Sequence, residues 1–401
     1  MKNLNLKLIV YEGLNSLERL RPAWEDLLAS YPAASIFSTW EWLAPWWRAF
    51  GGGQQLLVFA FFDDDGKLAA LAPLSIGTQR GPGGIKFRVL RLMGDGSQDS
   101  DNLDLPVRPG YEDAFIEALL NGLQQRAHAW HYAEMNTFPS SSPAAALLSQ
   151  HLSWRRWTTL THRRPWSVVS LPDTWDKFLK QLTSKERGKI GLRTRRLEKR
   201  CCVRFVKCTD QQGIPPCLEA LFSMHQRHWQ ILGEPGSFLL EARRNFYFDI
   251  ARTLLARQWL EFWFLDLDGK PVAAQFGFRY RNTVYSLQEG FDPDYSSDSV
   301  GYVLRGYVLK QLIAEGVSRY DFLAGEAPSK ARWGAQVSNY IDLHFARPYT
   351  LGSAYLKLRH SAQQTKEWLR AHLHGTAWLA LHRINVRLQG ASPPKGAASE
   401  E

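Results

Sequence analysis

The stretch WLEFWFLDLDGKPVAAQFGFRYRNTVYSLQE, residues 259–289, predicts three consecutive β-strands joined by tight turns. Its first run ends at Asp268-Gly269, a dipeptide typical of a β-hairpin turn. In the second run, 272–280, apolar and polar residues alternate as they do in a strand with two different faces. A third run at 283–289 completes an antiparallel meander.

A helix and further strands follow this meander. Apolar residues recur at three- and four-residue intervals from Val300 to Leu312, with Asp298 or Ser299 as the expected N-cap and Gly316 beyond the end. The remaining runs predict a strand at 318–323, a helical turn at 329–334 and a strand at 339–346. The predicted order is β-β-β-α-β-α-β.

The first half of the chain repeats much of this order. A hairpin turns at Asp63–Gly66, and then come a strand, an acidic loop, a helix and another strand, at 85–93, 95–104, 111–123 and 130–135. We therefore expect an α/β protein of two related halves, each a mixed, largely antiparallel sheet flanked by helices. The expected units are 1–165, 166–350 with a basic helical insertion at 174–204, C-terminal helices at 351–390 and a disordered tail at 391–401.

Several short phrases carry a family resemblance. They are FSTWEW at 37–42, WW at 46–47, GFDPDY at 290–295, SVG at 299–301, YDFLAGE at 320–326 and KARW at 330–333. Together they resemble the GNAT acyltransferases, more narrowly the CelD/BcsL branch associated with cellulose and exopolysaccharide biosynthesis. That branch is similar to the Fem peptidyltransferases. Val300 and Ser329 depart from the family pattern, which usually has Pro and Tyr at these positions.

The resemblance implies a function and its alternatives. It implies tandem GNAT-like halves that transfer an acyl group, with acetyl as the first candidate, from acyl-CoA to a nitrogen or oxygen atom. The acceptor would be a small or sugar-linked molecule in exopolysaccharide or cell-envelope biosynthesis. Similarity to the Fem proteins implies a second possible donor, aminoacyl-tRNA. A third possibility is a catalytically silent scaffold of a polysaccharide machine.

The expected acyl-CoA site lies at the predicted helix of the second half. A large anion needs backbone donors at a helix N-terminus, which Ser299 and Gly301 could supply, and Arg305 could add charge. Helix–sheet packing is an equal alternative for Gly301. In the first half, Glu112 and Asp113 open the equivalent helix and would repel a pyrophosphate, so we expect that half to hold the acceptor.

Acyl transfer also needs a base and oxyanion donors. Glu289, at the end of the third strand, is the first candidate for the base, with an exposed strand-end glutamate as the alternative. Asp321 and Lys330, with Trp333, resemble the functional cluster of the family. An ion pair between Asp321 and Lys330 that only orders the loop is the alternative.

Candidate acceptor-binding residues lie in both halves. Asp101 and Asp104 could hold an amine or a hydroxyl, the alternative being a solvated acidic turn, which is at least as plausible for Asp99. Gln275 could face a ligand or a structural partner, because burying it without a hydrogen bond is costly. The tryptophans at positions 40, 42, 46 and 47 are predicted to be core rather than ligand platform.

Charge and cysteine content narrow the partners. The net charge of +10 is concentrated at 185–204, where Arg193, Arg196 and Arg200 would share a helix face that suits tRNA, another polyanion or local acidic pairing. The four cysteines lack disulfide-framework and zinc spacing, so we expect no metal site. With no signal peptide or apolar stretch of spanning length recognised, we expect a cytoplasmic setting.

Overall fold

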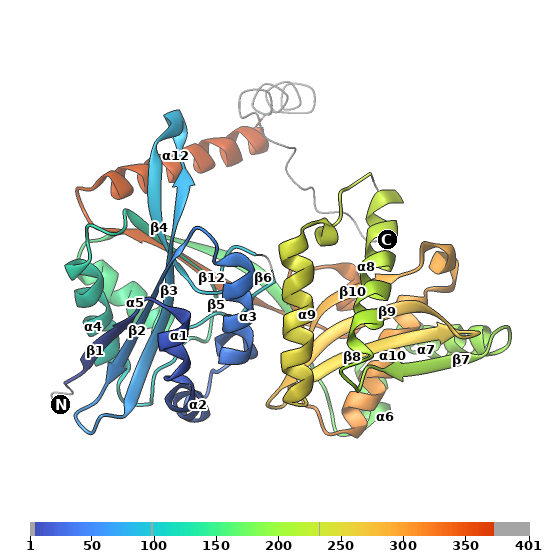
Figure 1. The fold of residues 1–401 in the computed structure, drawn as a ribbon. Coiled ribbons are helices and arrows are strands. Elements are labelled where there is room, and N and C mark those ends of the chain that lie inside the picture. Colours follow the sequence, from blue (N-terminus) through green and yellow to red (C-terminus); the bar gives the residue numbers. More distant parts are fainter. Residues whose placement is uncertain (1–4, 98, 232, 373–401) are drawn as a thin grey trace.

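The computed structural model describes residues 5–97, 99–231 and 233–372 and shows one twelve-stranded mixed sheet flanked by helices (Figure 1). The first half contributes β1 (Lys7–Tyr11), β2 (Gln55–Phe62), β3 (Leu68–Arg80), β4 (Lys86–Leu92), β5 (Tyr132–Pro139) and β6 (Thr158–Ser170). The second half contributes β7 (Val203–Lys207), β8 (Leu260–Leu267), β9 (Lys270–Tyr280), β10 (Thr283–Phe291), β11 (Arg319–Ala324) and β12 (Gln336–Ala346). The α/β prediction is confirmed.

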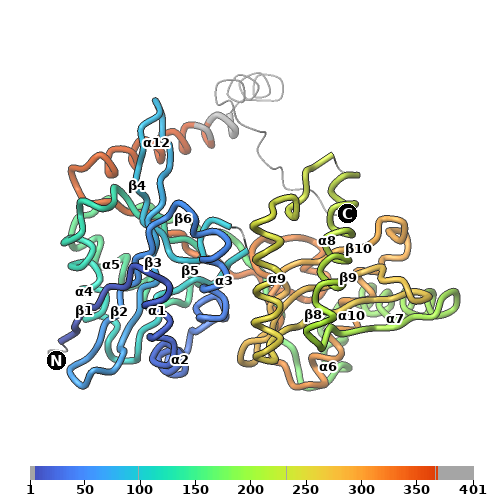
Figure 2. The backbone as a smooth tube through the Cα atoms, viewed as in Figure 1, coloured from blue at the N-terminus to red at the C-terminus, as the bar shows by residue number. Residues whose placement is uncertain are grey.

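The helices complete two equivalent halves. They are α1 (Leu14–Glu18), α2 (Arg21–Ser30), α3 (Trp40–Phe50), α4 (Glu112–Gln125), α5 (Pro143–Trp154), α6 (Trp175–Gln181), α7 (Ser184–Glu198), α8 (Ile214–Ile231), α9 (Glu241–Ala256), α10 (Val300–Ala314), α11 (Pro328–Ala331) and α12 (Leu351–His372). The run β1-β2-β3-β4-α4-β5-α5-β6 has its counterpart in β7-β8-β9-β10-α10-β11-α11-β12. In Figure 2, α3 and α9 lie side by side where the halves meet.

The two halves exchange their last strands. The sheet order is β1-β2-β3-β4-β5-β12-β6-β11-β10-β9-β8-β7, so β12 pairs with β5 of the first half and β6 pairs with β11 of the second. β6 and β12 also pair with each other, from Thr158 opposite Ala346 to Val168 opposite Gln336. The expected boundary between residues 165 and 166 falls inside β6. This exchange joins the halves through backbone hydrogen bonds.

Local turn chemistry accounts for the predicted meander. β8 and β9 meet at Asp268-Gly269, where φ is +52° and +84°, the left-handed pair that a tight hairpin turn needs. The predicted helix is α10, and Gly316 lies beyond its end with φ of +76°. The strand and helix predictions for 259–346 are therefore confirmed, with β10 extending to Phe291.

The predicted helical insertion at 174–204 contains two helices, α6 and α7, and the start of β7. Leu182 ends α6 in an extended conformation, and Thr183 then caps α7 by accepting a hydrogen bond from the Glu186 N–H at 3.3 Å. The chain therefore breaks before the basic stretch begins. Of the predicted C-terminal region, α12 covers 351–372, and the predictions for 373–390 and for the tail lie outside the described residues.

The tryptophan prediction holds. Trp40, Trp42 and Trp46 of α3 are buried, Trp42 completely, and Trp47 packs at the edge of the same core. Trp42 contacts Phe246 of α9 with ring centroids 5.3 Å apart, so this aromatic helix fastens the two halves together. Each edge-to-face aromatic pair adds about 0.5–1.5 kcal/mol beyond area burial.

Candidate functional site

A gap opens between the parallel strands β10 and β11. They pair with each other only from Thr283 opposite Arg319 to Tyr285 opposite Asp321. Beyond these residues, β10 remains paired with β9 alone and β11 with β6 alone. A β-bulge after Ser286 places Leu287 outside the regular ladder. The strands consequently diverge, as they must to admit an extended ligand between them.

This gap holds a cavity of about 300 Å³, which we name the split cavity. It is lined by Asp101, Ser286, Leu287, Glu289, Arg305, Phe322, Leu323, Ala324, Ser329 and Lys330. Leu323, on its wall, has φ of +60°. A non-glycine residue in this region costs of order 1–3 kcal/mol and is found preferentially at functional sites.

Two predicted site residues hold each other at the split cavity. Arg305 Nε donates to Glu289 Oε1 at 3.1 Å, and a second guanidinium nitrogen binds Glu289 Oε2. Ser286 Oγ also donates to Glu289 at 3.3 Å. A carboxylate that gives both oxygens to a guanidinium is poorly placed to collect a proton, which argues against Glu289 as the base.

The start of α10 is open to a ligand. Ser299, with φ of +55°, precedes the helix without a side-chain cap, so the first N–H groups point outward without that partner. A Cβ built on Gly301 would meet nothing within 4 Å. Packing therefore does not explain the glycine, whereas close approach of a ligand to the backbone would.

The acidic residues before α10 are neutralised. Asp292 binds Arg227 and Lys270, both at 2.7 Å, and Asp298 pairs with Arg200. Three cations thus compensate charge that would otherwise oppose an anion at this helix end.

Asp321, Lys330 and Trp333 surround the bulge in β11. Asp321 is buried and accepts a hydrogen bond from the Leu323 N–H at 2.8 Å, and burial raises its pKa to about 7. Lys330 Nζ donates to backbone carbonyls of residues 322–325, the shortest at 2.6 Å to Ala324. Trp333 is buried against Tyr302, with ring centroids 4.6 Å apart. Of the three, Lys330 lines the split cavity, while Asp321 and Trp333 are buried behind it.

Asp101 connects the split cavity to a second, larger one. Its Oδ2 accepts a hydrogen bond from the Ala324 N–H at 2.9 Å, and burial raises its pKa. The second cavity, of about 730 Å³, lies over β5, β6 and β12 and is bordered by α12; we name it the polar cavity. Asp101 and Ala324 line both cavities.

The loop that carries Asp101 is clamped from several sides. Trp46 and Trp42 of α3 donate their indole N–H groups to Ser97 and Ser100 at 2.8 and 2.9 Å. Asp99 is 2% exposed, so the solvated-turn alternative is wrong for it. It binds Arg243 of α9 at 3.1 Å and Tyr247 at 3.2 Å.

Asp104 is an anchor of the same loop. It is buried, and its two oxygens accept hydrogen bonds from Tyr31 and Ser142, each at 2.6 Å. These contacts favour a structural role over the predicted acceptor contact.

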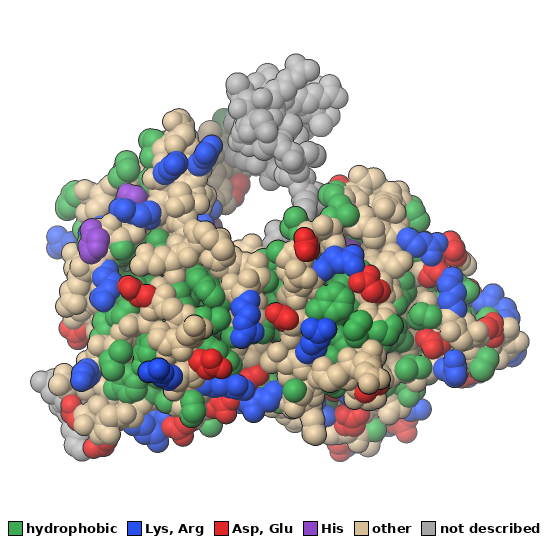
Figure 3. All heavy atoms as spheres, in the orientation of Figure 1, with side chains coloured by type: hydrophobic (Ala, Val, Ile, Leu, Met, Phe, Trp, Pro, Cys, Tyr) green, Lys and Arg blue, Asp and Glu red, His purple; other side chains and the backbone are tan. Residues whose placement is uncertain are grey.

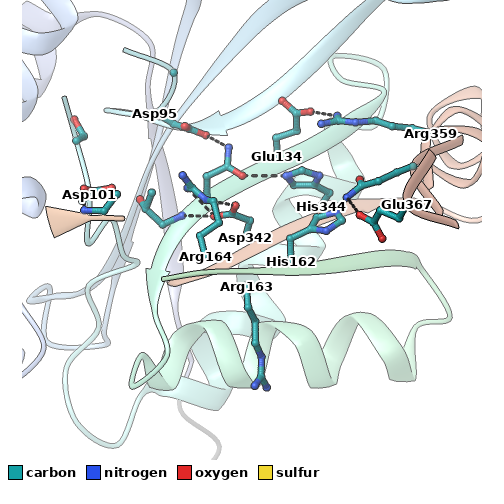
Figure 4. A pocket seen from close by; sticks show the side chains of 16 residues that line it. Asp95, Asp101, Glu134, His162, Arg163, Arg164, Asp342, His344, Arg359 and Glu367 are labelled. Carbon is teal, nitrogen blue, oxygen red and sulfur yellow. Dashed lines mark hydrogen bonds and ion pairs between the residues drawn. The ribbon is translucent and has the colours of Figure 1, made fainter. Parts of the chain in front are cut away.

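The walls of the polar cavity are built from ion pairs and amide contacts (Figure 4). Glu134 lies between Arg91 and Arg359, and Arg164 binds Asp342. Along the strand floor, Asn136 donates to Asp95 at 2.7 Å and contacts His344 at 3.0 Å. Burial lowers the pKa of His344 to about 4, so its imidazole is neutral at physiological pH.

Most of the wall residues of the polar cavity, unlike Asp101, could not be found from the sequence. They come from β5, β6, β12 and α12, which lie far apart in the chain and meet only through the strand exchange. Taken singly, each is an ordinary strand or helix side chain. The one usable signal was the run His162-Arg163-Arg164, which is too polar for a buried strand.

Gln275 lies opposite Glu289 in the β9–β10 pair and is 1% exposed. Neither its side-chain nitrogen nor its oxygen has a hydrogen-bond partner in the described chain. A buried, unpaired amide costs about 1–3 kcal/mol per group. A structural partner within the described chain is absent, and the prediction that Gln275 faces a ligand stays a prediction.

The basic segment is partly structural. The Arg193 guanidinium lies 4.8 Å from the Tyr302 ring centroid, and Arg200 pairs with Asp298, so two of the three arginines predicted to share a face contact α10 and its entry loop. Arg195, Arg196 and Lys199 are exposed. Within residues 5–97, 99–231 and 233–372, no cluster of three or more His, Cys, Asp or Glu side chains suits a metal ion. In the same part of the chain, no helix is both long and apolar enough to span a membrane.

Comparison with known proteins identifies the class of the second half. Residues 184–331 match the family described as Acetyltransferase (GNAT) domain. The match runs from α7 to α11 and includes both strands of the split cavity. The chain therefore contains a GNAT acyltransferase domain. No curated protein sequence matches the chain.

Solved structures resemble the whole chain. The crystal structure of FemX aligns with a TM-score of 0.59 at 12% identity, over 87% of this chain and 99% of that one. A conserved protein of unknown function from Bacteroides thetaiotaomicron gives 0.52 at 12% identity, over 85% and 100%. A tandem GNAT protein from the clavulanic acid biosynthesis pathway gives 0.46 at 12% identity, over 85% and 98%. The first two alignments show that the fold extends across both halves.

Proposed function

We propose that this protein transfers an acyl group from acyl-CoA in the split cavity to an acceptor in the polar cavity. The observation that carries the proposal is the junction at Asp101 and Ala324, which line both cavities. Two substrates bound in these cavities would meet beside one carboxylate.

Asp101 is the general base of this proposal. Its raised pKa makes it a better proton acceptor than an ordinary aspartate, and its Oδ1 accepts no hydrogen bond within the described residues. It takes one proton from the acceptor, whose nitrogen or oxygen bonds to the acyl carbon as the carbon–sulfur bond breaks. The departing thiolate gains one proton, which Asp101 returns by way of solvent, so charge balances and the Asp101 carboxylate is restored. The backbone N–H of Leu287, at the bulge, is the donor assigned to the oxyanion.

Acyl-CoA fits the residues around the split cavity. The open backbone at Gly301 and the uncapped start of α10 suit a pyrophosphate, and the diverging strand β10 suits the amides of an extended pantetheine arm. The small volume favours a short acyl group, with acetyl-CoA as the donor. The exopolysaccharide or cell-envelope setting is supported by the CelD/BcsL resemblance of the motifs.

Gly301→Val is expected to weaken acetyl-CoA binding by about tenfold or more, since the new side chain would fill the space through which a phosphate approaches the backbone. Its free energy of unfolding should change by less than about 1 kcal/mol. Isothermal titration and chemical denaturation measure the two effects.

Gly306→Val is the matched control on the same helix. A Cβ there would lie 3.4 Å from Trp333 and 3.5 Å from Ile190, so this variant should lose stability first. Equal losses of affinity and stability in the Gly301 variant would contradict the proposed pyrophosphate contact.

Aminoacyl-tRNA is the alternative donor, favoured by the fold shared with FemX and by the exposed cations of α7. If α7 grips tRNA, the Arg195→Glu/Arg196→Glu/Lys199→Glu variant should flatten the salt dependence of tRNA binding by about one log–log unit for each phosphate that the segment no longer neutralises. We expect instead weak tRNA binding with an unchanged slope and intact acetyl-CoA turnover. Loss of both would favour the tRNA donor.

A further inference from the structure

The polar cavity offers almost no apolar surface. Of the sixteen residues that line it in the described chain, Ala324 has a purely hydrocarbon side chain and Gly96 has none, while the others carry polar or charged groups. Ligand pockets are usually lined mainly by hydrophobic and aromatic side chains. An alkyl or aromatic ligand would leave these polar groups without water or partners, at about 1–3 kcal/mol for each buried group.

The charge of the cavity is unevenly compensated. Five carboxylates line it against three guanidinium groups, namely Asp95, Asp101, Glu134, Asp342 and Glu367 against Arg163, Arg164 and Arg359. Glu134 and Asp342 form ion pairs with arginines. In Figure 4, Arg163 points away from the cluster.

Asp95 and Asp101 are the carboxylates on the sheet side that no arginine or lysine of the described chain contacts in a salt bridge. Their carboxylates accept hydrogen bonds from the Asn136 amide and the Ala324 N–H, and neither forms a salt bridge within 4 Å in the described chain. Burial raises both pKa values, to about 6 for Asp95, and outweighs the nearby cations that lower them, Arg91 at Asp95 and Arg164 and Lys330 at Asp101. A cation that entered would relieve this cost, and a phosphate would add to it. His344, being neutral, supplies no counter-charge.

Building on the proposed function, we infer that the acceptor is a primary amine on a hydroxyl-rich, unphosphorylated scaffold, the chemical class of an amino sugar. Its ammonium group lies at Asp101, beside the split cavity, and its hydroxyl groups replace water on the ion-paired walls. Asp95 adds a second negative charge on the same side. The bound ammonium first releases one proton to solvent, and the neutral amine then gives a second proton to Asp101 as its nitrogen bonds to the acyl carbon. The product is an amide, so the reaction is N-acylation.

Binding without any donor tests the inference separately from catalysis. D-glucosamine is compared by isothermal titration with D-glucose, which lacks the amine, cyclohexylamine, which lacks the hydroxyls, and D-glucosamine 6-phosphate, which adds an anion. Each of the three should bind at least about tenfold more weakly than glucosamine, the loss expected for one charge-assisted contact. Cyclohexylamine, glucose or the phosphate ester binding as well as glucosamine would overturn the inference.

Two variants locate the ammonium site. Asp101→Asn should weaken glucosamine binding about tenfold and leave glucose binding unchanged. The control is Asp64→Asn, in an exposed turn, which should change the affinity for neither sugar. Equal losses for both sugars would place the amine elsewhere and overturn the assignment. If glucosamine binds but acetyl-CoA never acetylates it, the proposed function fails and the acceptor class stands. If acetyl transfer to cyclohexylamine is equally fast, the acceptor class fails and the proposed function stands.

Discussion

Asp101→Asn is expected to lower kcat by roughly 10²- to 10⁴-fold, the usual contribution of a general base. The asparagine keeps the size of the side chain and can still accept the Ala324 N–H, so the loop should stay in place. Acetyl-CoA affinity should be unchanged, because the residue acts on the acceptor. Steady-state kinetics with a titrated donor separate these effects.

The pH–rate profile is a second test of Asp101 as the base, and the sign of the expected change is defined. Burial raises the pKa of Asp101, and a base works only when it is ionised, so wild-type kcat/KM should rise with pH through that raised pKa. The Asp101→Asn variant should lose this limb. Glu289→Gln serves as the comparison, since Glu289 is already held by Arg305. If the acidic limb were lost only in the Glu289→Gln variant, Glu289 and not Asp101 would be the base.

Arg243→Met is expected to lower the free energy of unfolding by about 3–5 kcal/mol, the cost of removing one partner of a buried ion pair. The substitution leaves Asp99 buried with the Tyr247 hydroxyl as a remaining partner. Because Asp99 anchors the loop that presents Asp101, acceptor KM should also rise. Chemical denaturation and acceptor titration measure the two changes.

The stability loss should depend on pH in a defined sense. The pKa of Asp99, raised by burial to about 6, should rise further without the Arg243 guanidinium. The unfolded pKa is about 3.9, so the folded protein holds this proton more tightly and loses stability as pH rises between the two values. The deficit of the variant should therefore be larger at pH 8 than at pH 5. Arg244→Met, which breaks an exposed pair with Glu219, should cost less than about 1 kcal/mol at either pH. A deficit independent of pH would show that lost packing, rather than the charge of Asp99, causes it.

The geometry of the proposed site was only partly predictable. The start of α10, Glu289 and Arg305 could be placed because they lie in a strand and a helix that the local pattern reveals. Their mutual ion pair, which occupies Glu289, could not be predicted, since it depends on the distance between β10 and α10. Asp101 was singled out, but equally with Asp104, because a loop sequence does not show which carboxylate finds buried partners.

The sequence by itself determined the local elements. Alternation and turn dipeptides specify the hairpins at residues 55–80 and 260–280, and a 3.6-residue period specifies α10, because these signals arise from neighbouring residues alone. The same order of elements in both halves follows from such signals. The sequence pattern did not predict β6, because Pro165 and the adjacent basic residues are not typical of a buried strand. The polar face of β6 borders a cavity instead of a core.

Tertiary structure alone decided the exchange of β6 and β12 and, with it, the polar cavity. Two equivalent strands compete for two equivalent sheet edges, and the backbone hydrogen bonds of either pairing are alike, so no local pattern specifies the partner. Aromatic contacts between α3 and α9 also join the two halves. The exchanged pairing places Asp101 of one half beside the bulge of β11 in the other, because only the joined sheet carries both at the same point.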